Sequence, residues 1–191
     1  FGLRALLVVA VTTAACVFFE WGFEKLCHQK STICDLSAAV TGVLLAMNLP
    51  VSIPLWQAVF GGLVAIVAVK GLFGGIGKNF ANPAITARIV MFLAFSKTMT
   101  AWVFPDAVST ATPLAMMANG ESVNYLTLLL GNHGGCIGET SALALLIGFA
   151  YLLFRQVISW HTPVCFVGTV FVLSLVLGQD AVGQILSGGL M

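Results

Sequence analysis

Charged residues are scarce in this sequence. Eight Lys and Arg and seven Asp and Glu make up 8% of the 191 residues, whereas an ordinary soluble domain carries about a quarter. This scarcity excludes a soluble domain. The net charge of +1 provides neither the basic surface that nucleic-acid binding needs nor an acidic tail. Because 59% of the residues are hydrophobic, we expect the protein to work inside or beside a membrane.

Features of a secreted, disulfide-bonded protein are also lacking. The five cysteines are odd in number, and two of them lie deep in apolar runs, so we predict mostly free thiols. The sequence opens on Phe1 and contains neither an initiator Met nor a signal-peptide cleavage site. We therefore expect an internal piece of a longer protein.

Long apolar runs are what the sequence does contain. A membrane-spanning helix needs about 20 mostly apolar residues, and the few charges and prolines mark where such segments end. Pro50 and Pro54 divide the charge-free stretch 36–69 into two helices, and Asn82-Pro83 is typical of a helix start. The pattern predicts an all-α polytopic membrane protein. Its six predicted transmembrane segments are about 3–23, 36–49, 55–70, 83–104, 140–154 and 158–177.

The distribution of basic residues predicts the orientation. Cytoplasmic loops are enriched in Lys and Arg, and alternate loops of this chain differ strongly in them. The predicted cytoplasmic set is Lys25, Lys30, Lys70, Lys78, Arg88 and Arg155. The predicted outer set is Arg4, Lys97, Asp106, Glu121, Glu139 and Asp180. This assignment places the loop 105–138 on the outer side.

The loop 105–138 is longer than most connections, and such loops tend to be functional. Within it, Thr112-Pro113 is typical of a helix start, with Asn119-Gly120 ending a short helix. The same arrangement would present free amide groups to a phosphate at Thr112. A structural cap and an anion site are compatible, and the residues alone leave both open.

The stretch Asp106-Ala-Val-Ser-Thr-Ala-Thr112 resembles the flavin-attachment motif Asp-x-x-Ser-x-Ala-Thr of the sodium-pumping quinone reductase and Rnf electron-transfer families. In that motif the final Thr is esterified to the phosphate of FMN. The stretches 35–50, 73–83 and 137–147 resemble the D subunit of the Rnf complex in the same order, and the B subunit of the quinone reductase is the second match. The resemblance covers essentially the whole chain.

The resemblance implies a single integral membrane domain over 1–191, with an inverted-repeat fold similar to urea channels, in the bacterial inner membrane. It implies a redox-driven translocase component that relays electrons through covalent FMN and couples their flow to sodium or proton transport, catalysis belonging to the whole complex. Implied partners are the lipid bilayer, a flavin transferase and the other Rnf membrane subunits, including the G subunit with its covalent FMN. A second flavin such as riboflavin is also implied. The attachment motif is Asp106, Ser109, Thr110 and Ala111, with Thr112 carrying the FMN.

Two other functions fit the helix pattern. One is that of the B subunit of the sodium-translocating NADH:quinone reductase, and the other is a urea-channel-like transporter of small solutes, which fold analogy alone supports. A pore has no need for the motif that ends at Thr112. The motif therefore distinguishes a flavin-carrying redox subunit from a solute channel.

Three further patterns concern phosphate, metal and helix packing. The Gly-rich segment 73–83 fails as a phosphate loop because Leu72 and Asn79 occupy positions where that loop needs Gly and Ser or Thr, so we predict a tight, re-entrant turn. His133 and Cys136 are too few for zinc, which takes about four ligands, and we predict no metal site. Gly61-Gly62 and Gly148 are predicted at helix contacts, where small residues allow close approach.

Overall fold

The computed structural model describes residues 2–28, 32–75, 77–101, 125, 129, 135–138 and 141–186. These residues form helices and turns, with no strand among them, so the predicted all-α class is confirmed. The chain divides into two compact units, Phe1–Val103 and Phe104–Met191, and each is described by itself below. The single membrane domain over 1–191 stays a prediction.

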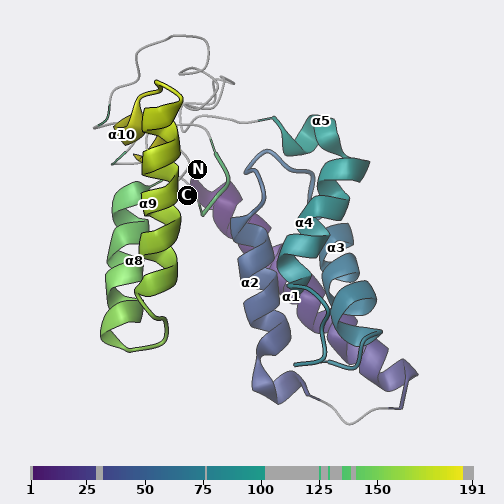
Figure 1. Cartoon of the computed structure of the whole chain (residues 1–191). Coiled ribbons are helices and arrows are strands. Elements are labelled where there is room, and N and C mark those ends of the chain that lie inside the picture. Colours follow the sequence, from purple (N-terminus) through teal and green to yellow (C-terminus); the bar gives the residue numbers. More distant parts are fainter. Residues whose placement is uncertain are drawn as a thin grey trace. The chain divides into compact units, whose positions relative to one another are not determined.

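The first unit is a bundle of helices in which α1 packs against α2, α3 and η2, while α4 packs against η2 and α2 (Figure 1). The helix η2 is a π-helix that continues α3 without a break, and η1 is a single 3₁₀ turn. The elements are α1 (Gly2–Leu26), η1 (Ile33–Asp35), α2 (Ser37–Met47), α3 (Leu55–Leu63), η2 (Val64–Gly71), α4 (Pro83–Ala94) and α5 (Ser96–Met99).

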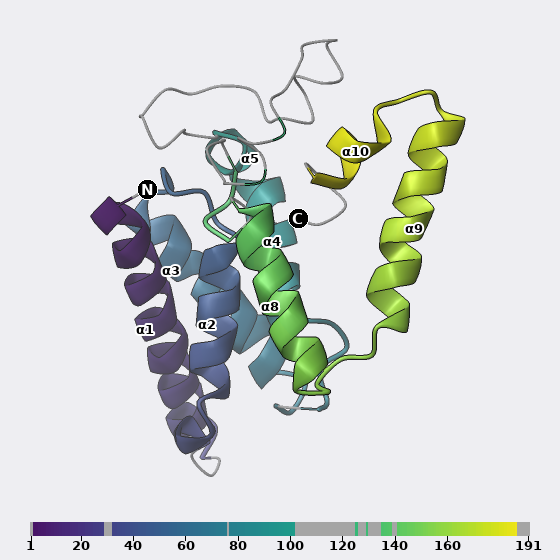
Figure 2. The ribbon, with the colours of Figure 1, turned by 90° about the vertical axis from the view of Figure 1, so that its left-hand side faces the viewer.

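The second unit contains α8 (Ala142–Phe154), α9 (His161–Val176) and α10 (Ala181–Gln184) (Figure 2). Ser141 caps α8 by accepting a hydrogen bond from the amide of Ala144 at 3.3 Å. This cap marks the start of the helix within the fifth predicted segment, 140–154.

Five of the six predicted apolar segments coincide with helices to within about three residues at each end. The prediction of one continuous helix over 83–104 is wrong, because α4 ends at Ala94 and α5 begins at Ser96. The break lies at Phe95, whose φ of −131° and ψ of 43° leave the helical region. Its ring packs edge-on against Trp56 and Phe60 of α3, with centroid distances of 5.2 and 5.6 Å. The start at Asn82 is confirmed, since its side chain accepts the amide of Ala84 at 3.0 Å.

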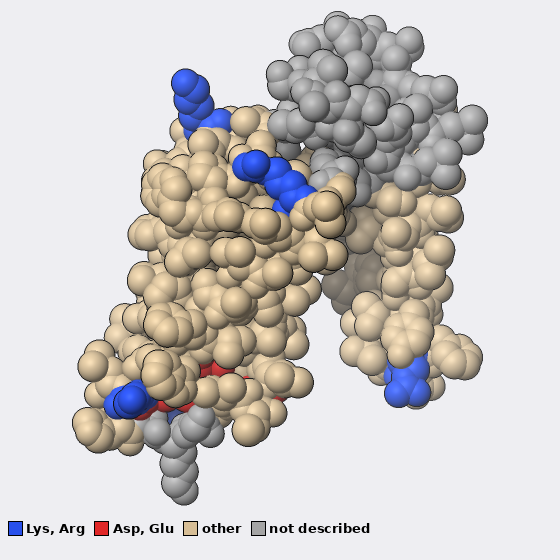
Figure 3. All heavy atoms as spheres, turned by 180° about the vertical axis from the view of Figure 1, so that it is seen from behind, with Lys and Arg blue, Asp and Glu red and all other residues tan. Residues whose placement is uncertain are grey.

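The helices differ in length relative to a membrane. In the described ranges, α1 with 25 residues is the one helix long and apolar enough to span a membrane, and 17% of its apolar window is buried. Five other apolar helical runs have 10–17 residues. On the face shown in Figure 3, charged side chains of the first unit lie toward its two ends, and those visible on the second unit lie at one end. The number of transmembrane segments therefore stays a prediction.

Glycines mark the closest helix contacts. A Cβ at Gly61 would overlap Met91 Sδ, and one at Gly62 would lie 3.2 Å from Cys16 Sγ, which confirms both as contact positions. The tightest backbone approach was not predicted: a Cβ at Gly42 of α2 would lie 2.7 Å from Thr13 Cα of α1. No heavy atom of the described residues lies within 4 Å of the Cβ position of Gly148, so the contact there stays a prediction.

We expect Gly42→Ala and Gly148→Ala to change stability in opposite directions. Alanine favours a helix interior over glycine by about 1 kcal/mol, so Gly148→Ala should raise the midpoint of thermal unfolding. At Gly42 the added methyl group meets backbone, and overpacking should destabilise by about 1–3 kcal/mol. Thermal unfolding of the detergent-purified protein measures both changes. Equal stabilisation by the two variants would contradict a close α1–α2 contact at Gly42.

Candidate functional site

The predicted flavin-attachment motif lies outside the described residues. This holds for Thr112 and for the rest of the motif, Asp106, Ser109, Thr110 and Ala111. Attachment at Thr112 therefore stays a prediction from sequence. The described part contains a different polar site, in the first unit.

A buried ion pair joins two apolar helices at this site. Lys70 of η2 donates from Nζ to Oε1 of Glu20 on α1, and both side chains are 6% exposed. The same ammonium group donates to Oγ of Ser37, the first residue of α2. Three helices thus converge on one lysine. A buried charge is costly unless it is paired and hydrogen-bonded, and Lys70 meets both conditions.

A second buried acid lies one helical turn beyond the ion pair. Oε1 of Glu24 accepts hydrogen bonds from the amide and the hydroxyl of Thr32, at 2.8 and 2.5 Å. Residues four apart on a helix share a face, so Glu20 and Glu24 project from the same side of α1. The second oxygen, Oε2, of each carboxylate is buried, and no hydrogen-bond partner for it is found among the described residues.

Asp35 lies at the exposed edge of the site, just before α2. Its Oδ1 accepts the amide of Ser37 at 2.8 Å. The pKa of Asp35 is held below its ordinary value, mainly by a hydrogen bond from the side chain of Ser37 and secondly by the one from the Ser37 amide. Leu36, between these two residues, adopts a left-handed backbone with φ of 57°. The chain therefore turns sharply where Ser37 meets Lys70.

The two glutamates and Lys70 line a pocket of about 280 Å³. In η2 the backbone widens: the amide of Leu72 bonds the carbonyl of Val67 at 3.1 Å, five residues back, and the amide of Gly75 bonds that of Lys70 at 3.0 Å. Helical segments with this hydrogen-bond spacing are rare in proteins, and those that occur are often found at functional sites. The lining residues are Glu20, Phe23, Glu24, Thr32, Asp35, Ile66, Lys70, Gly71, Gly74 and Gly75.

The glycine-rich segment forms the turn that the sequence predicted. Gly74, Gly75 and Gly77 have φ of 96°, 90° and 79°, a region that favours glycine because it has no Cβ. Gly74 and Gly75 both line the pocket. The tight turn is confirmed, and its re-entrant position in a membrane stays a prediction.

Sequence reasoning missed this site. Lys70 was assigned to the cytoplasmic loops, and Glu20 fell inside the first predicted span without a role. Ionisable residues within transmembrane segments are functional candidates by default. The sequence feature that could have revealed the site is one acid, Glu20, near the end of an apolar segment and one base, Lys70, at the end of another. Such a combination predicts a buried ion pair.

The side chain of Arg88 contacts a different end of α2 from that of Lys70. Its Nη1 donates to Oδ1 of Asn48 at 3.0 Å, at the C-terminal end of α2, whereas Lys70 contacts Ser37 at the N-terminal end. Arg88 and Lys70 thus contact opposite ends of α2, and their common cytoplasmic side stays a prediction. The side chain of Arg88 is directed to the other end of α2 because Asn48 provides an acceptor there. Arg4 also lies near that end, donating to the carbonyls of Val51 and Ser52 at 3.0 and 3.3 Å.

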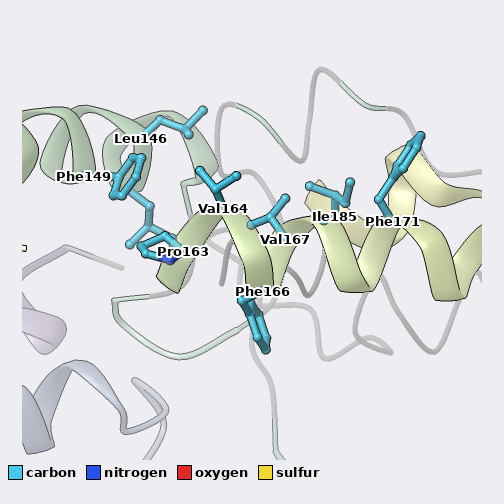
Figure 4. Close-up of a pocket in the computed structure, with 10 residues that line it drawn as sticks. Leu146, Phe149, Pro163, Val164, Phe166, Val167, Phe171 and Ile185 are labelled. Carbon is cyan, nitrogen blue, oxygen red and sulfur yellow. The ribbon is translucent and has the colours of Figure 1, made fainter. Parts of the chain in front are cut away.

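A larger pocket of about 580 Å³ lies within the second unit (Figure 4). Phe149 and Leu146 of α8 and Val164 and Phe171 of α9 line it with six other apolar or glycine residues. These described side chains offer no charged or hydrogen-bonding group that would fix a cation or a phosphate. The polar pocket in the first unit is the stronger candidate for chemistry.

Tyr125 and Asp180 form an exposed pair in the second unit. The Tyr125 hydroxyl donates to Oδ2 of Asp180 at 2.5 Å, and this hydrogen bond raises the pKa of Tyr125 and lowers that of Asp180. The phenol should therefore ionise above its usual pKa of about 10. We expect Asp180→Asn to lower the midpoint of that ionisation, measured as the difference in absorbance at high pH. An unchanged midpoint in Asp180→Asn would show that the pair does not form.

Comparison with known proteins assigns this chain to a family. The model of the NQR2, RnfD, RnfE family matches residues 1–191. The chain belongs to this family. Among relatives, it is 44% identical to the D subunit of the Na⁺-translocating ferredoxin:NAD⁺ oxidoreductase complex of Acetobacterium woodii, over all of this chain and 63% of the relative. It is 35% identical to the D subunit of the proton-translocating ferredoxin:NAD⁺ oxidoreductase complex of Clostridium ljungdahlii, over all of this chain and 65% of the relative.

The family also includes relatives of the second type that the sequence resembles. The B subunit of the Na⁺-translocating NADH-quinone reductase of Neisseria meningitidis is 38% identical over 64% of this chain and 33% of the relative. The resemblance to the D and B subunits of the two complexes is thus confirmed. The chain spans somewhat less than two thirds of the length of the two ferredoxin:NAD⁺ oxidoreductase relatives.

Proposed function

We propose that this chain is part of a membrane subunit of an ion-translocating electron-transport complex of the Rnf type. The observation that carries the proposal is the match along the full chain to the D subunits of two ferredoxin:NAD⁺ oxidoreductase complexes. One relative is named for Na⁺ and the other for protons, so relatedness leaves the transported ion open. The protein would work as a redox-driven translocase only with the rest of its complex.

The proposed membrane arrangement has six spans, with the loop 105–138 on the outer side of the bacterial inner membrane. Apolar helices with large exposed side chains support it: Leu3, Leu93 and Phe154 are 87%, 78% and 86% exposed. Lipid tails would cover such surfaces without cost, whereas water would not. The fold of the whole subunit would be an inverted repeat similar to that of urea channels.

We expect single-cysteine labelling to report this orientation. In a background without the native cysteines, a cysteine at position 78 should react with an impermeant maleimide only after the membrane is opened. A cysteine at position 121 should react from outside in intact cells, because basic loops stay in the cytoplasm. The reverse pattern would move the loop 105–138 to the inner face.

The proposed cofactor is FMN joined to Thr112 through a phosphoester. The support is the motif from Asp106 to Thr112 and the Pro113 that follows, which is typical of a helix start whose amides suit a phosphate. Ser109, Thr110 and Ala111 complete the motif, and a second flavin such as riboflavin would bind elsewhere in the complete protein. Bound FMN would supply electron transfer, and the protein would fix its position and exclude water.

The proposed partners follow from the same relatives, which are named as subunits of multi-subunit complexes. They are the other Rnf membrane subunits, including the G subunit with its covalent FMN, together with the flavin transferase that would recognise Asp106. The surrounding lipid is the remaining partner.

Mass spectrometry of the full-length protein tests the proposal. The peptide spanning residues 105–120 should carry the added mass of FMN less water, and the protein band should fluoresce in a denaturing gel. An unmodified peptide from an active, fully assembled complex would overturn the flavin assignment.

A further inference from the structure

The apolar pocket of about 580 Å³ in the second unit extends along the helix α9 (Figure 4). Its lining on α9 runs from Pro163 to Phe171, and these eight residue steps rise about 12 Å. One leaflet of a bilayer has a hydrocarbon depth of about 15 Å, half of the core. Phe149 of α8 faces the same space, and every lining residue is apolar or glycine. The pocket therefore has the depth and the surface that suit an acyl chain.

A basic residue lies at one end of the two helices that form this pocket. Arg155 directly follows α8 and is exposed, six residues and so about 9 Å beyond Phe149. Between Glu139 and Asp180 it is the one charged residue of the sequence, so no acid in that stretch offsets its charge. A guanidinium group binds phosphate through parallel hydrogen bonds. Arg155 therefore complements an anionic headgroup, while the pocket complements its acyl chain.

An aromatic pair at the start of α9 indicates the level of the membrane surface. Trp160 is 57% exposed, and its ring stacks on that of His161 with the centroids 4.1 Å apart. Tryptophan is enriched at membrane–water interfaces, because its ring is apolar and its N–H group is polar. Pro163, where the pocket begins, follows His161 by two residues. The pocket therefore begins just inside the interface, at the end where Arg155 lies.

We propose that this pocket binds one acyl chain of an anionic phospholipid whose phosphate is bound by Arg155. Lipid tails and the pocket lining are equally apolar, so shape holds the chain while charge selects the lipid, because basic residues near a membrane surface attract anionic lipids. The inference rests on the membrane location in the proposed function and is independent of the flavin.

Photochemical cross-linking in the intact complex tests this site. The complex, with its full-length subunit, is placed in phosphatidylcholine bilayers with a trace of phosphatidylglycerol that carries a diazirine in one acyl chain. Peptide mass spectrometry should locate the product on residues 142–154 or 161–176. Unlabelled phosphatidylglycerol at ten times its dissociation constant should lower the yield about tenfold, whereas the same amount of additional phosphatidylcholine should not.

Two results of this experiment would overturn the proposal. Equal competition by the two unlabelled lipids would show that the helices contact only bulk lipid. Absence of the product from both helices would show that other parts of the full-length subunit cover the pocket.

Gly168 allows the pocket to be filled by mutation. It lines the pocket, and no heavy atom of the described residues lies within 4 Å of its Cβ position, so a leucine there would occupy the space of the acyl chain. Gly168→Leu should lower the yield to that seen with excess unlabelled phosphatidylglycerol. Gly148→Leu is the matched control, because Gly148 is equally uncrowded by described atoms and does not line the pocket. An unchanged yield in Gly168→Leu would overturn the proposal, and if that variant does not assemble, the wild-type competition decides.

Variants of Arg155 test the selection of the headgroup. Arg155→Gln should lower the preference for phosphatidylglycerol over phosphatidylcholine about fivefold, the contribution of one basic residue near a membrane surface. Arg155→Lys should keep most of the preference. An unchanged preference in Arg155→Gln would overturn the role of Arg155. Thr112→Ala should leave cross-linking unchanged, because lipid binding needs no flavin, so failure of the flavin proposal and failure of the lipid proposal are distinguishable.

Discussion

Thr112→Ala is expected to abolish covalent flavin while the protein still inserts into the membrane. Alanine has no hydroxyl oxygen, so a phosphoester cannot form at position 112 in this variant. The loss should be complete, measured as flavin fluorescence of the protein band in a denaturing gel and as the mass of the 105–120 peptide. Electron transfer through the complex should fall with it.

Ser109→Ala and Thr110→Ala are the matched controls, because each removes a hydroxyl group within four residues of Thr112. Both should keep at least part of the flavin, since neither fills the final position of the motif. FMN on the peptide of Thr112→Ala would place the attachment elsewhere. Complete loss in Ser109→Ala with full flavin in Thr112→Ala would move the assignment to Ser109.

The second large effect is expected from Lys70→Met. Methionine has nearly the length of lysine without its charge, so the variant leaves Glu20 buried without its ammonium partner. Removing one member of a buried ion pair costs about 3–5 kcal/mol, which corresponds to a fall of about 10 °C in the midpoint of thermal unfolding. Native gels and thermal unfolding of the purified complex measure the loss.

The double variant Glu20→Gln with Lys70→Met is the control for charge. It removes both members of the pair, so the midpoint should recover by at least half of the loss. Ser37→Ala should cost about 1 kcal/mol, because Lys70 loses one hydrogen bond but keeps its carboxylate. If the double variant were as unstable as Lys70→Met alone, packing rather than charge would explain the effect.

Apolar runs and their boundaries predict the helices of this chain well, because the scarce charges and prolines fall between them. Asn82-Pro83 starts a helix as the sequence indicates. The break at Phe95 could not be predicted, since it depends on two aromatic rings about 40 residues earlier, at Trp56 and Phe60. Packing between helices overrides local propensity there.

The candidate sites differ in how far the sequence predicts them. A contiguous motif such as Asp106 to Thr112 is visible in one stretch of sequence, whereas Glu20 and Lys70 are 50 residues apart and meet only after three helices pack. Gly42 was missed as a contact for the same reason, because its neighbour Thr13 belongs to another helix. Spacing within one segment contains no information about such pairs.

The short helix α2 has a consequence for the lipid around the first unit. Its 11 residues rise about 16 Å, roughly half of a hydrocarbon core about 30 Å thick. The carbonyls of Val51 and Ser52 beyond its end are bound by the guanidinium group of Arg4, in the first turn of the 25-residue helix α1, so a fixed cation lies at the level where α1 begins. Headgroups and water are drawn toward such a charge. The stretch 48–54 after α2 therefore reaches the level of Arg4 that the short helix alone does not, and two of its carbonyls are bound there by a side chain.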